Sequence, residues 1–293
     1  MGSTRRTGGL SGGICEAGFR YQEGVESVTD LVVPIGERPD DDGSVVKVTP
    51  ESAGWKYVGF EVLRLAGGRP VERRAIGEEV CLVVLEGYCE VTTGDHEWRG
   101  VGERDSVFEG SPCALYLPPG TTYRIEADTY LELAVCSAPA ETEGAPFLVR
   151  PEEIEAEVRG SGNMERRIHP ILMGDEPVER LLVTEVLTPN GHWSSYPPHK
   201  HDQDNLPDES YLEETYYHRV QPPQGFAVQR VYTEDRSLDE TVTVHDGDTV
   251  LVPRGYHAVS APPGYDLYYL NVMAGPVREW KFKNDPDHEW LFG

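Results

Sequence analysis

The sequence has few basic residues and lacks a long apolar run. Lysine and arginine total 26 against 51 aspartates and glutamates, so the formal net charge is −25. Such a charge repels phosphate backbones, and we therefore expect no nucleic-acid partner. No apolar segment is long enough to span a bilayer, and no signal-type apolar stretch follows the N-terminal residues. The sequence thus predicts a protein without a membrane anchor.

The sequence also lacks paired cysteines. Its five cysteines are odd in number and form no Cys-x-x-Cys motif: Cys15, Cys81, Cys89, Cys113 and Cys136. Four of them lie in apolar, strand-like runs, where a thiol behaves as a small hydrophobic group. Free buried thiols suit a reducing compartment, which predicts a cytoplasmic protein.

Glycine and proline are abundant, with 31 and 23 residues among 293, and they separate short runs rich in Val, Leu and Tyr. This pattern is typical of β structure with many turns and predicts an all-β fold. The expected strands are 57–65, 79–85, 88–92, 113–117, 123–127, 130–136, 181–187, 214–220, 226–233, 249–252, 258–261 and 267–273. Glu86-Gly87 is expected to be the turn between two of them.

Two halves of the chain resemble each other. Leu117-Pro118-Pro119-Gly120 matches Val252-Pro253-Arg254-Gly255, and at the same separation Glu79 matches Glu214 and Thr122 matches His257. An internal duplication of an all-β unit explains this correspondence. We expect a mobile segment over 1–24, a first unit over 25–140, a linker over 141–168 with a short helix at 152–158, and a second unit over 169–293 that ends in an aromatic tail. The tail is expected to dock on a barrel or on a second subunit.

A candidate metal site lies in the second unit only. Alternate residues of a strand share a face, so His199 and His201 would point into one interior. His257 follows a Pro-x-Gly turn, and Glu214 opens an aromatic run. Three imidazoles and one carboxylate suit zinc, iron, manganese or nickel. Because a polar insertion separates His201 from the carboxylates, Glu209 and Glu213 are alternatives to Glu214, and ordinary surface histidines are the alternative to a metal site.

The order of these ligands resembles the cupin metal-binding motifs, and the duplication then implies a bicupin, two small β-barrels in one chain. Longer strings are similar to the 5-deoxy-glucuronate isomerase family of myo-inositol catabolism, over about Trp55 to Trp290. They include Trp193-Ser194-Ser195-Tyr196-Pro197-Pro198-His199-Lys200-His201-Asp202 and Tyr268-Tyr269-Leu270-Asn271-Val272-Met273-Ala274-Gly275-Pro276.

The resemblance implies an aldose–ketose isomerase that converts 5-deoxy-glucuronate, a small sugar acid, to 2-deoxy-5-keto-gluconate. It also implies one divalent metal, most simply zinc, on His199, His201, Glu214 and His257, with a metal-free first barrel. A cupin dioxygenase and a non-catalytic sugar-binding bicupin are the alternative functions. A homo-oligomer is an open alternative to a single chain.

Three further residues are candidates for the chemistry. If Glu214 faces inward on a strand, Tyr216 and His218 do so too, and His218 has an ordinary pKa near neutrality that suits a general base. Arg230 on a neighbouring strand could hold the substrate carboxylate. The structural alternatives are a hydrogen-bonded histidine, a tyrosine that fills the barrel, and an arginine that pairs on the surface.

Overall fold

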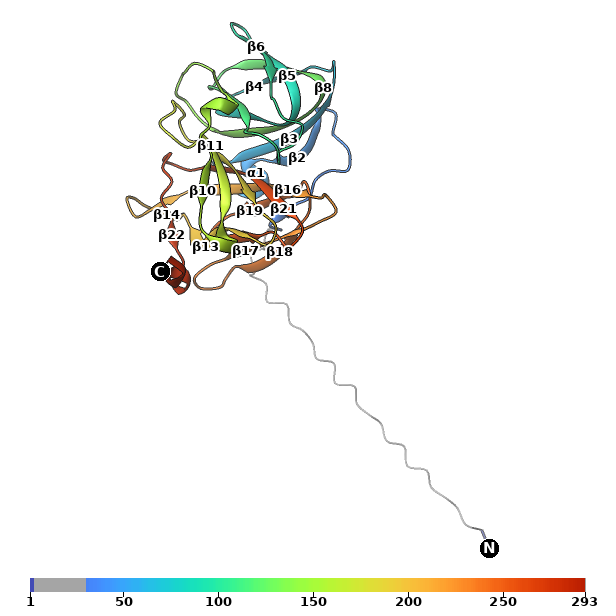
Figure 1. Ribbon diagram of the computed structural model, residues 1–293, viewed down its shortest axis with the longest axis vertical. Coiled ribbons are helices and arrows are strands. Elements are labelled where there is room, and N and C mark those ends of the chain that lie inside the picture. Colours follow the sequence, from blue (N-terminus) through green and yellow to red (C-terminus); the bar gives the residue numbers. More distant parts are fainter. Residues whose placement is uncertain (3–29, 293) are drawn as a thin grey trace.

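The computed structural model describes residues 1–2 and 30–292, so nearly all of the segment 1–24 and Cys15 lie outside the described residues. Two β-barrels lie one above the other (Figure 1). The first carries β4, β5, β6 and β8, and the second carries β13, β16, β17 and β21. Within the described ranges, no helix has both the length and the apolar character needed to cross a membrane.

The first barrel is an eight-stranded antiparallel sheet. Its strands are β2 (Ser44–Val48), β3 (Gly59–Ala66), β4 (Val71–Arg74), β5 (Glu78–Thr93), β6 (Glu97–Val101), β7 (Cys113–Leu117), β8 (Thr122–Pro139) and β9 (Phe147–Val149). The helix α1 (Pro50–Ala53) joins β2 to β3, and Thr49 caps its first turn by accepting a hydrogen bond from the Ser52 amide.

The second barrel is built from a seven-stranded, a five-stranded and a two-stranded sheet. The first of these contains β1 (Val32–Val33), β10 (Glu157–Arg159), β11 (Arg166–Leu172), β12 (Leu182–Thr188), β16 (Glu213–Gln221), β19 (Thr249–Val252) and β21 (Asp266–Ala274). The others contain β13 (Trp193–Lys200), β17 (Ala227–Tyr232), β18 (Asp239–Val244), β20 (Tyr256–Ser260) and β22 (Lys283–Asn284), and β14 (Asp202–Asn205) with β15 (Glu209–Tyr211). Three 3₁₀ helices complete the fold: η1 (Pro151–Glu153), η2 (Gly162–Met164) and η3 (Pro286–Phe292).

Glu86-Gly87 is a bulge rather than the expected turn. The chain continues through it as the single strand β5, whose pairing with β8 shifts register on both sides of this dipeptide. Gly87 has φ of +90°, and a Cβ there would lie within 2.1 Å of the Tyr130 carbonyl oxygen. Glycine is therefore required here by the bend of the backbone and by the close approach of β8. The sequence alone does not show whether a glycine at this position forms a bulge or a hairpin turn.

The expected boundaries between the units also change. The predicted helix at 152–158 is wrong, because only η1 is helical and residues 157–159 form strand β10. Within the expected linker, β9 pairs with β7 of the first barrel and β10 pairs with β11 of the second. Residues 32–33, expected in the first unit, pair with β19 of the second barrel instead.

The register of the two barrels shows which interior positions are equivalent. Val80 pairs with Leu117 in the first barrel, and Glu214 pairs with Val252 in the second. Because Leu117 and Val252 match in the repeat, the equivalent of Glu214 is Val80, and the expected match with Glu79 is off by one residue. A slip of one residue in a strand exchanges its two faces.

This equivalence explains the difference between the two interiors. The first barrel has Val80, Leu82 and Val84 where the second has Glu214, Tyr216 and His218, so these interior positions are apolar. The three polar residues of β16 thus have no counterpart on β5, although Val80 borders a separate cavity of about 560 Å³ in the first barrel. A separate apolar core, which includes Phe60, Tyr217 and Tyr268, lies between the barrels.

Candidate metal centre

Three histidines meet in the second barrel where β13 pairs with β20. His199 lies opposite His257 in this pairing, and His201 follows directly after the end of β13. The ring centroids of His199 and His257 are 4.6 Å apart, and those of His201 and His257 are 5.4 Å apart. One nitrogen from each ring lies within 4.8 Å of the others, so the group could hold a metal ion.

Glu214 completes this group from β16. Its Oε2 atom lies 3.2 Å from Nε2 of His201 and 3.0 Å from Nε2 of His257. The other ring nitrogens, Nδ1 of both histidines, lie 3.2 Å from the carbonyl oxygens of Leu212 and Gly255. A carbonyl only accepts hydrogen bonds, so each Nδ1 carries the hydrogen and each Nε2 of a neutral ring presents a lone pair.

Three buried atoms are therefore left without hydrogen-bond partners: Nε2 of His201, Nε2 of His257 and Oε2 of Glu214. Lone pairs that face one another in a buried site are unfavourable unless a proton or cation lies between them. Imidazole nitrogens and a carboxylate oxygen are ligands typical of a divalent transition metal. The residues present thus fit such an ion.

The structure separates Glu214 from the two alternative carboxylates. Glu213 points toward the first barrel and accepts hydrogen bonds from the amides of Lys56, Tyr57 and Val58. Glu209 accepts hydrogen bonds from the Lys200 ammonium group. Among these three glutamates, only Glu214 lies beside the histidines.

The charges at the centre differ from ring to ring. Burial and the neighbouring His257 and His201 hold the pKa of His199 well below its ordinary value, which favours the neutral ring. Burial alone would lower the pKa of His201, but the Glu214 carboxylate raises it, so a positive charge, from a proton or a metal ion, is favoured between these two groups. Burial alone would raise the pKa of Glu214, but His257 and His201 hold it well below its ordinary value. Asn271 also donates a hydrogen bond of 2.5 Å to Oε1 of Glu214 and so fixes the carboxylate.

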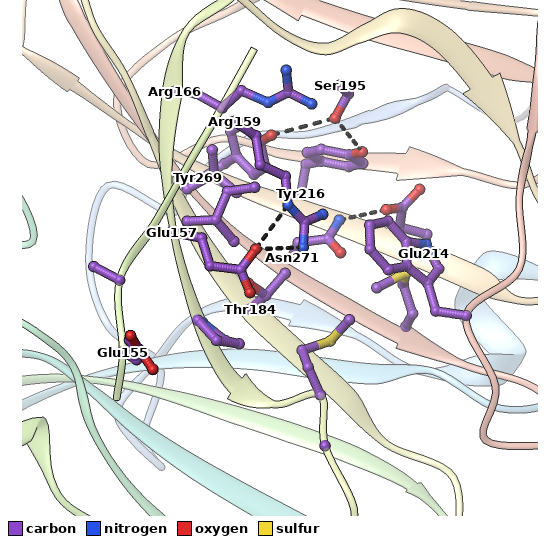
Figure 2. Close-up of a pocket in the computed structure, with 18 of the residues that line it drawn as sticks. Glu155, Glu157, Arg159, Arg166, Thr184, Ser195, Glu214, Tyr216, Tyr269 and Asn271 are labelled. Atoms are coloured by element: carbon purple, nitrogen blue, oxygen red, sulfur yellow. Dashed lines mark hydrogen bonds and ion pairs between the residues drawn. The ribbon is translucent and has the colours of Figure 1, made fainter. Parts of the chain in front are cut away.

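The centre opens into a cavity of about 550 Å³. His199, Glu214, Tyr216, Tyr269 and Asn271 line it, together with residues from β10, β11 and the C-terminal segment (Figure 2). The volume lies in the range of small-molecule sites. Tyr216, which was predicted to point into the barrel, therefore faces a space large enough for a sugar acid.

Three hydroxyl groups form a chain along the cavity. Oγ of Ser195 lies 3.0 Å from the Tyr216 hydroxyl and 3.3 Å from the Tyr269 hydroxyl. Figure 2 shows both interactions as dashed lines. Burial, with Glu214 nearby, raises the pKa of Tyr216 well above its ordinary value, so this hydroxyl stays protonated at neutral pH and is able to donate a hydrogen bond.

The structure corrects the role expected for Arg230. Its side chain is exposed, and its guanidinium group forms hydrogen bonds of 2.8–3.0 Å with the Asp239 carboxylate on β18. Arg230 pairs on the outer surface because its position on β17 has the opposite parity to the inward-facing Gln229 and Val231. It does not line the cavity and cannot hold a substrate there.

The structure places His218 beside Tyr216. The side chain points inward as predicted, does not line the cavity, and stacks on the Tyr216 ring at 6.0 Å. Its Nε2 lies 2.9 Å from Oε1 of Gln229, and burial lowers its pKa to about 4. His218 is thus a buried histidine that supports Tyr216, and its role as the base stays a prediction.

Two further supports of the centre lie outside the predicted ligands, and sequence reasoning missed the first of them. Lys200, between the two histidines, is buried and donates to Asp202 and Glu209, while Asp202 accepts from the amide of Gly255 beside His257. These contacts tie the charged hairpin β14–β15 to the ligands. The available signal was a lysine placed between the two histidines and followed by several carboxylates.

The second support is the aromatic tail, which was expected to dock on a barrel or on a second subunit. Strand β22 pairs with β13 at His199, and the Phe282 ring lies 4.9 Å from the His199 ring. Trp280 lines the cavity. The prediction of docking on a barrel is confirmed.

Fold and site together define an all-β bicupin whose second barrel alone carries a group of histidines suited to a metal. The comparison with protein families is equally specific: the model of the KduI/IolB family matches residues 32–291, and the chain belongs to this family. The family resemblance predicted from the sequence is therefore confirmed.

Similar proteins support this assignment. A protein of Geobacillus thermodenitrificans named 5-deoxy-glucuronate isomerase is 59% identical over 254 residues, which cover 86% of this chain and 93% of that protein. A protein of the same name from Bacillus subtilis strain 168 is 47% identical over 249 residues, covering 84% and 92%.

Solved structures agree on the fold. The crystal structure of an IolB-like protein from Salmonella typhimurium LT2 has a TM-score of 0.87 and 44% identity, and the match covers 90% of this chain and all of that one. A Bacillus subtilis oxalate decarboxylase variant has a TM-score of 0.64 at 15% identity, covering 88% and 80%, and supports the fold alone.

Proposed function

We propose that this chain is a metal-dependent aldose–ketose isomerase that converts 5-deoxy-glucuronate to 2-deoxy-5-keto-gluconate. The observation that carries the proposal is the set of buried, unpartnered ligand atoms of His201, His257 and Glu214 beside a polar cavity of sugar-acid size. The names of the relatives supply the substrate.

The proposed metal ligands are His199, His201, Glu214 and His257. Zinc is the first choice, and manganese, iron and nickel suit the same ligands. When bound, such an ion would supply Lewis-acid polarisation of a carbonyl oxygen of the substrate. Asn271 keeps the Glu214 carboxylate in one orientation, and the two carbonyl contacts keep the imidazoles of His201 and His257 in the ligating tautomer.

Tyr216 is the proposed hydrogen-bond donor that touches the substrate. Its protonated hydroxyl donates a hydrogen bond to the sugar oxygen on which negative charge develops. Ser195 orients this hydroxyl and connects it to the Tyr269 hydroxyl along the cavity. The His218 ring stacks on the Tyr216 ring, and Gln229 holds His218 by a hydrogen bond. Both of these side chains stay uncharged, so no charge competes with the reacting oxygen.

We place the reaction in the cytoplasm, since the four described cysteines are buried free thiols, as a reducing compartment maintains them. The proposed partner is the small sugar acid alone; a net charge of −25 argues against nucleic acid. A homo-oligomer would have the exposed Trp290 and Phe292 available as contact residues.

The test is turnover of 5-deoxy-glucuronate by the purified, metal-loaded protein, measured with and without oxygen. Equal aerobic and anaerobic rates of 2-deoxy-5-keto-gluconate formation support the proposal, because isomerisation involves no net oxidation. Absence of product would overturn the isomerase, and oxygen consumption in proportion to substrate loss would establish a dioxygenase instead.

A further inference from the structure

Arg166, the first residue of β11, lines the cavity without a carboxylate partner. Its Nη1 atom donates hydrogen bonds to the carbonyl oxygens of Met164 at 3.1 Å and Tyr196 at 3.4 Å. Within the part of the chain that the structure describes, no acidic side chain pairs with it. Burial lowers its pKa from an ordinary value of 12.5, yet a guanidinium group remains charged at neutral pH.

An unpaired cation is unusual in this molecule, whose acidic residues outnumber the basic ones. Other arginines that are partly or wholly buried pair with carboxylates: Arg104 with Glu185, Arg219 with Glu132, and Arg73 with Glu61. A charge removed from water without a counter-ion costs free energy. Arg166 therefore has unused capacity to bind an anion in the cavity.

The position of Arg166 in the fold directs this capacity to the cavity. Arg166, Ile168 and Pro170 alternate along β11, and all three line the cavity, whereas Arg167 is exposed and does not. The guanidinium group packs against Gly160, where a Cβ would lie 2.9 Å from Nη1. Gly160 has φ of +83°, so both its conformation and its missing side chain hold this arrangement.

The other arginine of the cavity is already neutralised. Arg159 on β10 forms hydrogen bonds of 2.7 and 2.9 Å with the Glu157 carboxylate and stacks over the Trp280 ring at 5.6 Å. Of the two arginines that line the cavity, only Arg166 is free to pair with an incoming carboxylate.

We propose that Arg166 is the binding residue for the carboxylate of the substrate and the residue that makes the site specific for a sugar acid over a neutral sugar. Figure 2 shows Arg166 and Glu214 on different sides of the drawn residues, with the Ser195, Tyr216 and Tyr269 hydroxyls between them. The carbonyl end of the sugar would lie at the metal ligands and the carboxylate at Arg166. This inference rests on the proposed isomerase function.

The experiment compares 5-deoxy-glucuronate with 5-deoxy-glucose, which has a neutral hydroxymethyl group in place of the carboxylate. Kinetics are measured for the wild type, Arg166→Gln, Arg166→Lys and the control Arg167→Gln, each with its metal content determined. Arg167→Gln removes the same charge from the outward face of the same strand.

We expect Arg166→Gln to raise KM for 5-deoxy-glucuronate about 10- to 100-fold, the value of a hydrogen bond to a charged group, with metal content retained. The rate on 5-deoxy-glucose should stay the same, so the preference for the acid is lost. Arg166→Lys keeps the charge but not the fork and should restore part of this preference. Arg167→Gln should match the wild type.

An unchanged KM in Arg166→Gln, or an equal loss on both sugars, would overturn the assignment and make the residue structural. If Arg166→Gln does not fold, Arg166→Lys provides the test. A lysine variant that binds both sugars more weakly but keeps the wild-type preference for the acid contradicts carboxylate binding by Arg166. A wild-type protein that turns over neither sugar refutes the isomerase function itself, which is distinct from an active enzyme that is indifferent to Arg166.

Discussion

Glu79 of the first barrel and Glu213 of the second occupy equivalent positions, and each accepts three backbone hydrogen bonds from the other half of the chain. Glu79 binds the amides of residues 179–181 just before β12, at 2.7–2.8 Å. Glu213 binds the amides of residues 56–58 just before β3, at 2.7–3.0 Å. The two glutamates thus connect the two barrels through equivalent sets of backbone hydrogen bonds.

This arrangement predicts that Glu79 stabilises the fold without taking part in the chemistry. Glu79→Gln should lower the free energy of unfolding by about 3 kcal/mol, because buried amides lose a charged acceptor. Activity per folded molecule should not change. Chemical denaturation monitors the first quantity, with the exposed Glu143→Gln as control; a variant as stable as this control would contradict the stabilising role.

The second prediction concerns the metal. His257→Ala should lose bound metal and turnover while it keeps a cooperative thermal transition, because a duplicated β core does not depend on a metal to fold as a zinc finger does. Elemental analysis and calorimetry on the same preparation give both results, and His245→Ala, a change at an exposed histidine, should retain the metal. Global unfolding on chelation would show that the site is structural.

The third prediction concerns Tyr216. Tyr216→Phe removes the donated hydroxyl hydrogen and should lower kcat about 10²-fold, as expected for the loss of one hydrogen-bond donor to a developing negative charge. Metal content should stay the same, since the tyrosine is not a ligand. His218→Gln keeps a hydrogen-bonding group below the ring and should reduce kcat much less; a larger loss there than in Tyr216→Phe would identify His218 as the base.

The fourth prediction concerns acid stability. Burial alone would raise the pKa of Glu132, but Arg219 and Arg64 hold it below the ordinary 4.5. A lowered carboxyl pKa stabilises the fold above about pH 4.5, and this stabilisation is lost as the pH falls through the folded-state pKa. Glu132→Gln should therefore show a weaker loss of stability than the wild type in this acidic range.

At neutral pH the same variant should be about 3–5 kcal/mol less stable, because two arginines lose a buried partner. Urea titrations at several pH values measure both effects. The exposed Glu152→Gln provides the comparison, and parallel pH profiles for Glu132→Gln and the wild type would rule out this source of acid sensitivity.

Alternation and the Pro-x-Gly turn are local properties of the chain, and they predicted the meeting of His199, His201 and His257. The all-β bicupin was predicted by the internal duplication together with the resemblance to the cupin motifs. The sequence could not predict that Val80 rather than Glu79 matches Glu214. The apolar run of β5 has buried residues on both faces, one set inside the barrel and one between the barrels. Such a run does not indicate which residues face the interior.

Other parts of the site depend on tertiary contacts that no local pattern records. Arg166 belongs to the end of a segment expected to be a linker, and Trp280 belongs to the tail, yet both line the cavity. The role predicted for Arg230 was wrong for a different reason. Its strand was predicted, but the direction of its side chain depends on a register that the sequence leaves undetermined.

The pairing of β22 with β13 at His199 also determines when the site can form during synthesis. Residues 280–284 follow β1 to β21 in the chain, and β1 has no partner until β19 has been synthesised. A ribosome-bound chain that has completed both barrels up to β21 therefore still has an open cavity next to His199. The cavity wall closes only after translation has passed Asn284, so the enzyme in this account acquires its finished pocket as one of its last folding events.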